Sequence, residues 1–327
     1  MKIALFTDAL EDRPLEEILA WLAADVPEVT EVELGTGGYS PAPHCPLRQL
    51  LSDASLRRQW QQVIADRGFR LAALNVSGNP LHPDPAAARS HDADLRDTIR
   101  LAAELQVDRV VAMSGCPGAG PRDRTAPHFS GGAWLPDLER IAEWQWLERV
   151  LPYWDEIAAF AAAEFPALRI CLELHPGTFV YNTTTFSRIA DVGEAVALNL
   201  DPSHFFWQSI DPLAVISVLG ARIAHVHGKD TRLNPDAVAL NGILDNRWPQ
   251  PADEMPWTFA TVGRGHEADW WSAFLRALAE ADFDGTIGIE HEDPFLGPEE
   301  GIIESARFLA AVMTSAPARA GATPGPE

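Results

Sequence analysis

Short apolar runs alternate along the chain with longer segments in which apolar residues recur every three or four positions. The short runs are typical of buried strands, and the longer segments are typical of amphipathic helices. This alternation continues through the chain, and no linker divides it into two parts. We predict eight strands, over 2–7, 30–34, 70–75, 108–113, 168–174, 195–200, 222–227 and 285–290.

A helical segment follows each predicted strand, and this regular order decides the fold class. Strand–helix units in succession favour a parallel sheet covered by helices, and eight of them are the number that closes a (β/α)8 TIM barrel. We therefore predict a single α/β barrel domain over 1–314. A doubly wound open sheet is the alternative, but no glycine-rich phosphate loop follows the first strand. The predicted helices cover 14–24, 55–67, 91–106, 137–163, 185–192, 211–219, 268–281 and 299–313, with a break at Pro152.

Three segments fall outside this repeat. The stretch 114–136 is too long for an ordinary connection, so we expect a functional loop, such as a lid or a binding loop. The stretch 229–266 is predicted to be a second long loop. Residues 315–327 are rich in Ala, Pro and Gly, and we expect them to form a disordered C-terminal tail.

The strongest chemical signal lies at the ends of four late strands. Pro202 cannot continue a central ladder, so the strand before it stops at a carboxylate. The carboxyl ends of parallel barrel strands meet on one face, where side chains from several strands can bind one ion. One such residue is more often a helix cap or a solvated loop residue, but four together predict a metal site. The four candidate ligands are Glu173, Asp201, His227 and Glu290.

These residue types indicate both the metal and the chemistry. Two glutamates, an aspartate and a histidine form an oxygen-rich set that suits one divalent ion, Mn²⁺ first, with Mg²⁺, Co²⁺ or Zn²⁺ as alternatives. An ion that holds a carbonyl and the neighbouring hydroxyl acidifies the C–H bond between them. Glu173 and Glu290 can then serve as an acid/base pair, one removing a proton and the other returning it.

The composition of the chain limits where the protein can be located and what it can bind. The formal net charge of −22 disfavours nucleic acid, whose phosphates require a basic surface. The chain has no apolar run of about 18 residues, and Asp8 interrupts the first run too early for a secretory signal, so we expect a cytoplasmic protein. The 3 cysteines are far apart and fit reduced thiols. The 11 tryptophans could form platforms for carbohydrate, although core packing is the favoured interpretation for most of them.

The segments around the strand ends resemble a known superfamily. The motifs that carry the resemblance are Glu173, Asp201-Pro-Ser-His204, His227-Gly-Lys-Asp, Ile289-Glu-His-Glu-Asp-Pro, Asn75-Val-Ser-Gly-Asn-Pro-Leu-His82 and Thr261-Val-Gly-Arg-Gly-His266. Over essentially residues 1–313 they are similar to the sugar phosphate isomerase/epimerase superfamily, which has a xylose isomerase-like TIM barrel. The resemblance implies that the four strand-end residues are metal ligands. It also implies that Glu173 and Glu290 act as the acid/base pair of ketose 3-epimerases.

The resemblance also implies substrate contacts. His204 would hydrogen-bond to substrate oxygens beside the metal, and Arg264 would contact the sugar. Asn75 and His266, in the two remaining motifs, are further substrate-binding candidates.

His175 departs from the epimerase pattern. C-glycoside deglycosidase alpha subunits are similar at this Glu-x-His; they cleave 3-oxo-glycosides through a metal-bound enolate with a histidine base, and they pair with a small beta subunit. Strand alternation would put Glu173 and His175 on the same side, so His175 is predicted as a catalytic base, with a structural cap as the alternative. Zinc-dependent AP endonucleases share the barrel, but Arg264-Gly-His266 stands where they carry an Asp-x-His ligand pair.

We therefore predict a divalent-metal-dependent sugar isomerase or epimerase that removes a proton next to the metal-bound carbonyl of a keto or aldo sugar. A carbon–carbon lyase of the C-glycoside deglycosidase kind is the main alternative, and an AP endonuclease-like nuclease is a lesser one. A sugar-binding barrel without turnover would not need the paired glutamates. The expected partner is a small carbohydrate, with no nucleic acid and no membrane. The chain is expected to form a homo-oligomer, or a heteromer with a small beta subunit.

Overall fold

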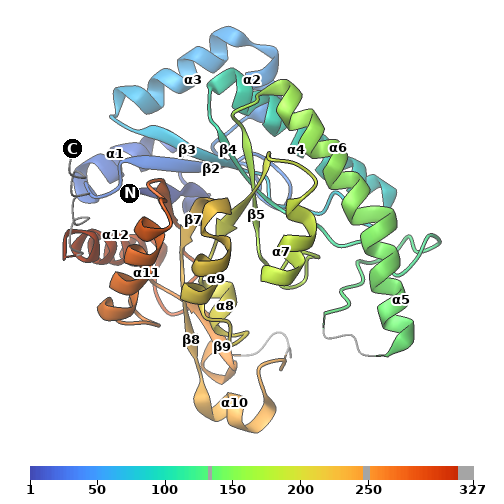
Figure 1. The fold of residues 1–327 in the computed structure, drawn as a ribbon. Coiled ribbons are helices and arrows are strands. Elements are labelled where there is room, and N and C mark those ends of the chain that lie inside the picture. Colours follow the sequence, from blue (N-terminus) through green and yellow to red (C-terminus); the bar gives the residue numbers. More distant parts are fainter. Residues whose placement is uncertain (132–134, 246–250, 316–327) are drawn as a thin grey trace, which may run out of the picture.

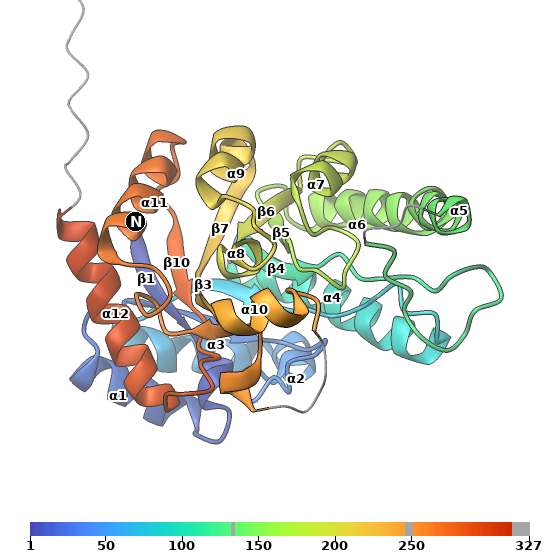
Figure 2. The ribbon, with the colours of Figure 1, turned by 90° about the horizontal axis from the view of Figure 1, so that it is seen from below.

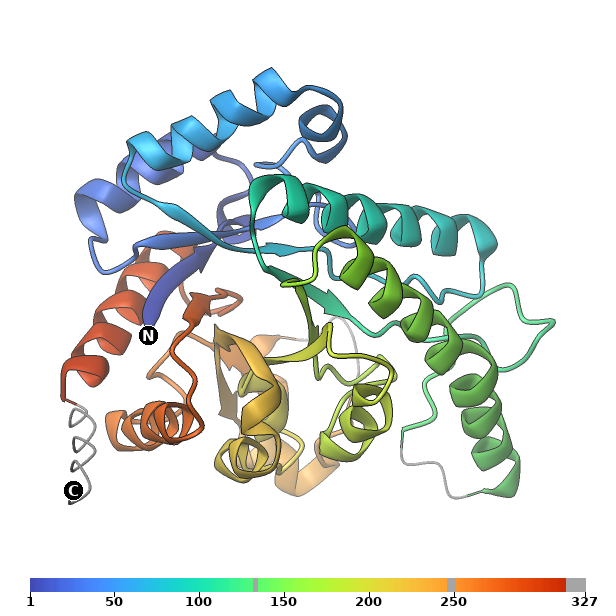
Figure 3. The same ribbon diagram turned by 45° about the horizontal axis from the view of Figure 1, so that its top comes forward.

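The structure is a computed structural model that describes residues 1–131, 135–245 and 251–315. Eight parallel strands close into a barrel in the order β1, β10, β7, β6, β5, β4, β3, β2. The eight predicted strands and the predicted TIM barrel are confirmed (Figures 1 and 3). The barrel strands are β1 (Lys2–Phe6), β2 (Glu31–Gly35), β3 (Arg70–Asn75), β4 (Arg109–Met113), β5 (Arg169–Glu173), β6 (Val196–Leu200), β7 (Ile223–Gly228) and β10 (Thr286–Ile289).

Helices surround the barrel and bury its outer face. The strands read as nearly continuous apolar runs because parallel strands are covered on both faces, and every residue of β2 and β6 is buried. The surrounding helices are α1 (Leu15–Asp25), α2 (Leu47–Ser52), α3 (Ala54–Asp66), α4 (Pro85–Leu105), α5 (Pro136–Gln145), α6 (Leu151–Glu164), α7 (Thr183–Ala190), α9 (Pro212–Leu219), α11 (Ala268–Glu280) and α12 (Pro298–Ser315).

The inside of the barrel is different from its outer face. Small side chains on adjacent strands form a cluster apart from the main core, namely Ala73, Val111, Cys171 and Ala197. All three cysteines of the chain are free and buried. These small residues leave room at the carboxyl ends of the strands for the polar side chains of the site.

The predicted helices are present, and their ends lie within two residues of the prediction except at the start of α4. α4 begins at Pro85 rather than at 91, because Asp84 caps it by accepting a hydrogen bond from the backbone N–H of Ala86. α12 ends at Ser315, one residue inside the segment expected to be disordered. The rest of that segment, 316–327, lies outside the described residues.

A wide helical turn replaces the break expected at Pro152. A π-helical segment (Trp146–Val150) joins α5 to α6, and the Leu151 N–H donates to Trp146 O. The wider turn accommodates Pro152, which has no N–H to donate and would interrupt a regular α-helix.

The segment 229–266 is not the irregular loop that we expected. Its described part folds into an antiparallel hairpin of β8 (Asp230–Leu233) and β9 (Trp257–Ala260), with α10 (Pro235–Asn241) between them. Trp257, Thr258 and Phe259 favour a strand, and Pro235 begins a helix capped by Asn234. This excursion projects from the barrel end where β7 ends, and α10 lies in front when that end is viewed (Figures 1 and 2).

Among the described helices, none combines the length and the apolar character that a membrane span requires.

Candidate metal centre and active site

The structure brings the four candidate ligands together. Glu173 ends β5, His227 lies in β7, and Asp201 and Glu290 directly follow β6 and β10. One ligand atom from each of the four lies within 4.8 Å of the others. His227 Nδ1 is 3.1 Å from Glu173 Oε2 and 3.3 Å from Glu290 Oε2. Four strand ends therefore converge on one point.

The donor set fits a divalent cation. Three carboxylates held this closely repel one another unless positive charge lies between them. Asp201 Oδ1 accepts the Ser203 N–H, whereas the buried Asp201 Oδ2 accepts no hydrogen bond of good geometry and has Lys229 Nζ and His204 Nε2 each 3.3 Å away. Such an oxygen in an oxygen-rich set is suited to metal coordination.

Glu33 sets the orientation of His227. Glu33 is fully buried in β2, and its Oε1 lies 3.2 Å from His227 Nε2. A carboxylate only accepts, so Nε2 carries the proton, and Nδ1 points at Glu173 and Glu290. Burial lowers the pKa of His227, but Glu33 and Glu290 outweigh burial and raise it above its usual range. A cation at Nδ1 would replace the second ring proton, as in carboxylate–histidine–metal arrangements.

The remaining bonds of Glu33 show that it belongs to a hydrogen-bond network. Asn75 Nδ2 donates to Oε1 over 2.8 Å, and His225 Nε2 lies 2.7 Å from Oε2. Burial alone would raise the pKa of Glu33, but His227 and His225 hold it well below its usual range. Glu33, His225 and His227 also lie close enough to hold an ion, but N–H donors already occupy both Glu33 oxygens. Asn75, predicted to bind substrate, therefore supports Glu33.

Lys229 contributes positive charge to the site. Its buried Nζ lies 2.6 Å from Glu290 Oε2, 2.9 Å from Glu292 Oε2 and 3.3 Å from Asp201 Oδ2. It also lies 4.4 Å from the centre of the Phe259 ring. Burial lowers the pKa of Lys229, but these three carboxylates raise it well above its usual range, so the ammonium keeps its charge.

His204 and Asn199 hold Glu173 in place. His204 Nε2 lies 3.0 Å from Glu173 Oε1, and Asn199 Nδ2 donates to Glu173 Oε2 over 2.9 Å. Burial raises the pKa of Glu173, but hydrogen bonds and charge from His204 and His227 lower it well below its usual range. Glu173 is therefore an ionised carboxylate.

His175 lies beside this group. Its ring centre is 4.2 Å from that of His204, and one of its nitrogens is close enough to share an ion with Glu173 and His204. His175 Nδ1 lies 2.6 Å from Pro176 O, which only accepts, so the second ring nitrogen keeps its lone pair. Burial and the nearby His204 lower the pKa of His175 to about 4, which leaves a neutral imidazole at pH 7.

Two predicted substrate contacts lie elsewhere. Arg264 is 41% exposed and pairs with Glu304 of α12 at 2.8 and 2.9 Å. His266 Nδ1 lies 2.7 Å from Asp230 Oδ1, and Asp230 Oδ2 accepts backbone N–H groups of the same loop. Buried Asp230 thus fixes the loop, and the structure does not bring Arg264 to the ligands.

A buried glutamine anchors the described part of the 114–136 loop to the helical layer. Gln145 Nε2 lies 3.1 Å from Pro117 O, 3.0 Å from Gly118 O and 2.8 Å from His128 O. Residues 132–134 lie outside the described part.

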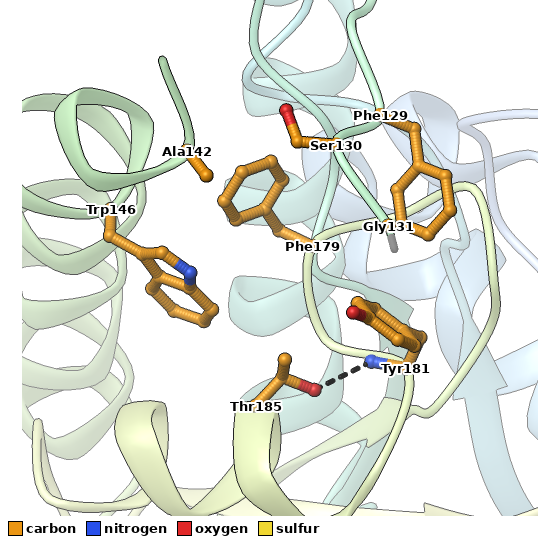
Figure 4. Close-up of a pocket in the computed structure, with 8 residues that line it drawn as sticks. All are labelled: Phe129, Ser130, Gly131, Ala142, Trp146, Phe179, Tyr181 and Thr185. Atoms are coloured by element: carbon orange, nitrogen blue, oxygen red, sulfur yellow. Dashed lines mark hydrogen bonds between the residues drawn. The ribbon is translucent and has the colours of Figure 1, made fainter. Parts of the chain in front are cut away.

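A small pocket lies beside this loop and is lined by the rings of Phe129, Trp146, Phe179 and Tyr181 (Figure 4). None of the proposed ligands lines it, and its volume is about 60 Å³. An engineered cavity of about 150 Å³ holds benzene, so this pocket is too small for a sugar ring.

Several residues of the site were not predicted from the sequence, namely Glu33, Asn199, His225, Lys229 and Glu292. Glu33 does not follow an apolar run, because Glu31 interrupts the apolar residues before it and Leu34 continues the strand, so the rule that found the four ligands passes over it. Lys229 lies two residues beyond His227 in a motif that carried the family resemblance.

Comparison with known proteins agrees with the fold. The model of the xylose isomerase-like TIM barrel family matches residues 31–312. The chain is 36% identical over 312 residues to the uncharacterized protein YfiH of Bacillus subtilis strain 168, covering 94% of this chain and 98% of that protein. It is 27% identical over 219 residues to an inosose dehydratase of Lacticaseibacillus casei, covering 62% of this chain and 64% of the enzyme.

A solved structure shows the same fold. The IOLI protein with a bound zinc atom has a TM-score of 0.65 and 19% sequence identity to this chain, over 97% of this chain and 99% of that protein. With the strand order and the family match, this likeness settles the architecture. The chain belongs to the xylose isomerase-like TIM barrel family.

Proposed function

We propose that this protein is a divalent-metal-dependent sugar isomerase or epimerase that enolises a keto or aldo sugar. One observation carries the proposal: the carboxylates of Glu173 and Glu290 meet at Nδ1 of His227, at 3.1 and 3.3 Å. Binding alone would not require two glutamates there, whereas moving a proton from one face of a carbon to the other does.

Glu173, Asp201, His227 and Glu290 would hold the ion, with Mn²⁺ as the proposed metal. When bound, a divalent ion supplies Lewis acidity, which lowers the pKa of the C–H group next to a sugar carbonyl. Burial raises the pKa of Glu290, but Lys229 and His227 outweigh burial and lower it to about 2, so this carboxylate is ionised at pH 7. Glu173, ionised as well, is the second carboxylate of the pair.

The neighbouring side chains orient and balance this pair. Lys229 holds Glu290 through its ammonium group and stabilises negative charge that develops on the substrate. His204, within hydrogen-bond distance of Glu173, is positioned to contact a substrate oxygen beside it. Both groups are buried, so their positions are set before substrate arrives.

Elimination is the second candidate, and His175 favours it. Proton removal next to a carbonyl is also the first step when a leaving group departs from the next carbon. The inosose dehydratase relative is named for such a loss of water. A neutral imidazole beside Glu173 and His204 would be the additional base of a lyase acting on a 3-oxo-glycoside. A small beta subunit is proposed only with that alternative.

Solvent deuterium exchange tests the shared first step before any product is known. The Mn²⁺-loaded protein is incubated in D₂O with a panel of ketoses, inososes and 3-oxo-glycosides, and C–H exchange is followed by NMR. We expect exchange next to the carbonyl of at least one substrate, and its loss in chelator. If the loaded protein exchanges no proton in any of them, the proposed function is wrong.

A further inference from the structure

A row of aromatic rings leads outward from the candidate metal centre. His204, which contacts Glu173, packs edge-on against Phe259 with ring centres 5.4 Å apart. Phe259 lies 5.3 Å from Trp257, which stacks on Trp207 at 4.7 Å with an interplanar angle of 1°. We call Phe259, Trp257 and Trp207 the aromatic row.

The hairpin turns one face of this row towards the centre. Phe259 and Trp257 are two residues apart in β9, so their side chains lie on the same face of the strand. The inner end of that face is fixed by Lys229, whose ammonium lies 4.4 Å from the Phe259 ring centre. At the outer end, Leu233 pairs with Trp257 across the hairpin and is 46% exposed. The face thus runs from the ligand cluster to solvent.

The aromatic row differs from the tryptophans of the core. Trp154 and Trp271 are completely buried and serve as packing. Phe259, Trp257 and Trp207 are each only partly buried, although they lie next to a buried charged site. Stacked indoles form a flat, rigid apolar surface, and such a surface loses little conformational entropy when a ring packs on it.

We infer that the aromatic row is a subsite for a second ring of the substrate. The inference rests on the proposed function, because the metal centre would hold the first ring. Phe259 stands one ring contact from His204, and Trp257 stands one contact further along the row, so a second ring has an aromatic surface next to the place of the first. The substrate class is therefore a glycoside with an uncharged planar or aromatic substituent, since the net charge of −22 disfavours an anionic one.

A pair of glycosides that differ only in the second ring tests the inference. Phenyl β-D-glucopyranoside and methyl β-D-glucopyranoside are titrated calorimetrically into the full-length, Mn²⁺-loaded protein. We expect the phenyl compound to bind about 10-fold more tightly, in line with the strength of one aromatic contact. Trp257→Ala should remove this preference while changing methyl glucoside affinity by less than about 2-fold, and Trp257→Phe should keep part of it.

Trp21→Ala is the matched control. Trp21 is also partly buried, but it lies on α1, where Arg13 packs over its ring. This variant should keep the phenyl preference. Thermal unfolding of each variant establishes that the barrel is intact.

The outcomes separate this inference from the proposed function. Equal binding of the two glycosides by the unmodified protein, or an equal loss of both in Trp257→Ala, overturns the subsite. A phenyl preference that Trp257→Ala abolishes supports the subsite even if no substrate exchanges deuterium. If deuterium exchanges into free ketoses but the phenyl glucoside binds no more tightly than the methyl glucoside, the proposed enolisation is supported and the proposed subsite is wrong.

Discussion

Glu31 and Glu33 stand two residues apart in β2, both are buried, and they do different things. Glu31 lies towards the start of the strand. Its Oε1 accepts from Lys2 Nζ at 2.9 Å and from Arg70 Nη2 at 2.5 Å, and both of these cations are about half exposed or more. This carboxylate ties neighbouring strands together at the amino end of the barrel.

Glu33 lies towards the carboxyl end of the strand, and its partners are two histidines, which can gain or lose a proton. Its oxygens meet His225 and His227, and His227 is a candidate metal ligand. Burial alone therefore does not mark a functional carboxylate in this barrel. The two carboxylates differ in their partners: Glu31 pairs with cations that are well exposed, whereas Glu33 meets two buried histidines, one of which faces the other candidate ligands.

Removing the metal or one of its ligands should have the largest effect at the functional end. Chelation should abolish activity, and Mn²⁺ should restore it. Asp201→Ala should weaken metal binding more than about 100-fold, beyond the effect expected of an outer residue, because a coordinating oxygen is lost. Elemental analysis and calorimetry measure this. Glu292→Gln is the control, since Glu292 contacts Lys229 but lies outside the ligand set. Full activity without bound metal would contradict the prediction.

Glu290→Gln should separate holding the metal from moving the proton. The amide keeps an oxygen for the ion but cannot accept a proton from carbon. We expect metal affinity to stay within about 10-fold while the exchange rate falls by ~10²–10⁴, the usual contribution of a general base. Normal turnover by a metal-loaded Glu290→Gln protein would remove Glu290 from the acid/base pair.

His175→Ala should distinguish the two chemistries. Loss of a base should lower turnover of 3-oxo-glycosides by ~10²–10⁴, and that of free ketoses by less than about 10-fold, because the glutamates remain. Since burial and His204 lower the pKa of His175 to about 4, the lyase rate should hold below pH 6.5 and fall only as pH approaches 4. Rates on both substrate classes measure this, and equal minor losses would make His175 a structural cap.

The matched pair Glu33→Gln and Glu31→Gln tests the opening comparison with the smallest expected effects. His225 and His227 meet different oxygens of Glu33, and Gln replaces one of these oxygens with an NH₂ donor, so Glu33→Gln should weaken Mn²⁺ binding about 10–100-fold. Glu31→Gln should leave Mn²⁺ affinity within about 2-fold and lower the free energy of unfolding by at most ~1 kcal/mol, because its cationic partners are well exposed. Calorimetry and thermal unfolding give both values. Equal metal affinities in the two variants would show that Glu33 has no more influence on the metal site than Glu31 has.

The sequence predicted the parts of this molecule that depend on local pattern. Apolar runs and helical periodicity identified the eight strands, and a proline directly after Asp201 marked where one strand ends. The ligand positions followed, because the ends of parallel strands meet on one face.

The missed parts depend on contacts between distant segments. Glu33 and His225 are 192 positions apart, and β2 and β7 are separated in the barrel by β1 and β10. They meet only across the closed interior, which no local pattern describes. Arg264 was expected at the sugar, but the Asp230 side chain fixes its loop where the guanidinium reaches Glu304. The hairpin was not predicted because its strands, β8 and β9, are only four residues long and pair with each other rather than with the barrel.

The three buried thiols give the molecule a built-in reporter of opening. Burial raises the pKa of Cys45, Cys116 and Cys171 to about 12 each, so almost no thiolate is available to alkylating reagents while the barrel is closed. Cys171 lies inside the barrel, so its labelling requires the ring of strands to part. The rate at which each cysteine is alkylated therefore reports how often the structure around that cysteine opens. No added probe is needed.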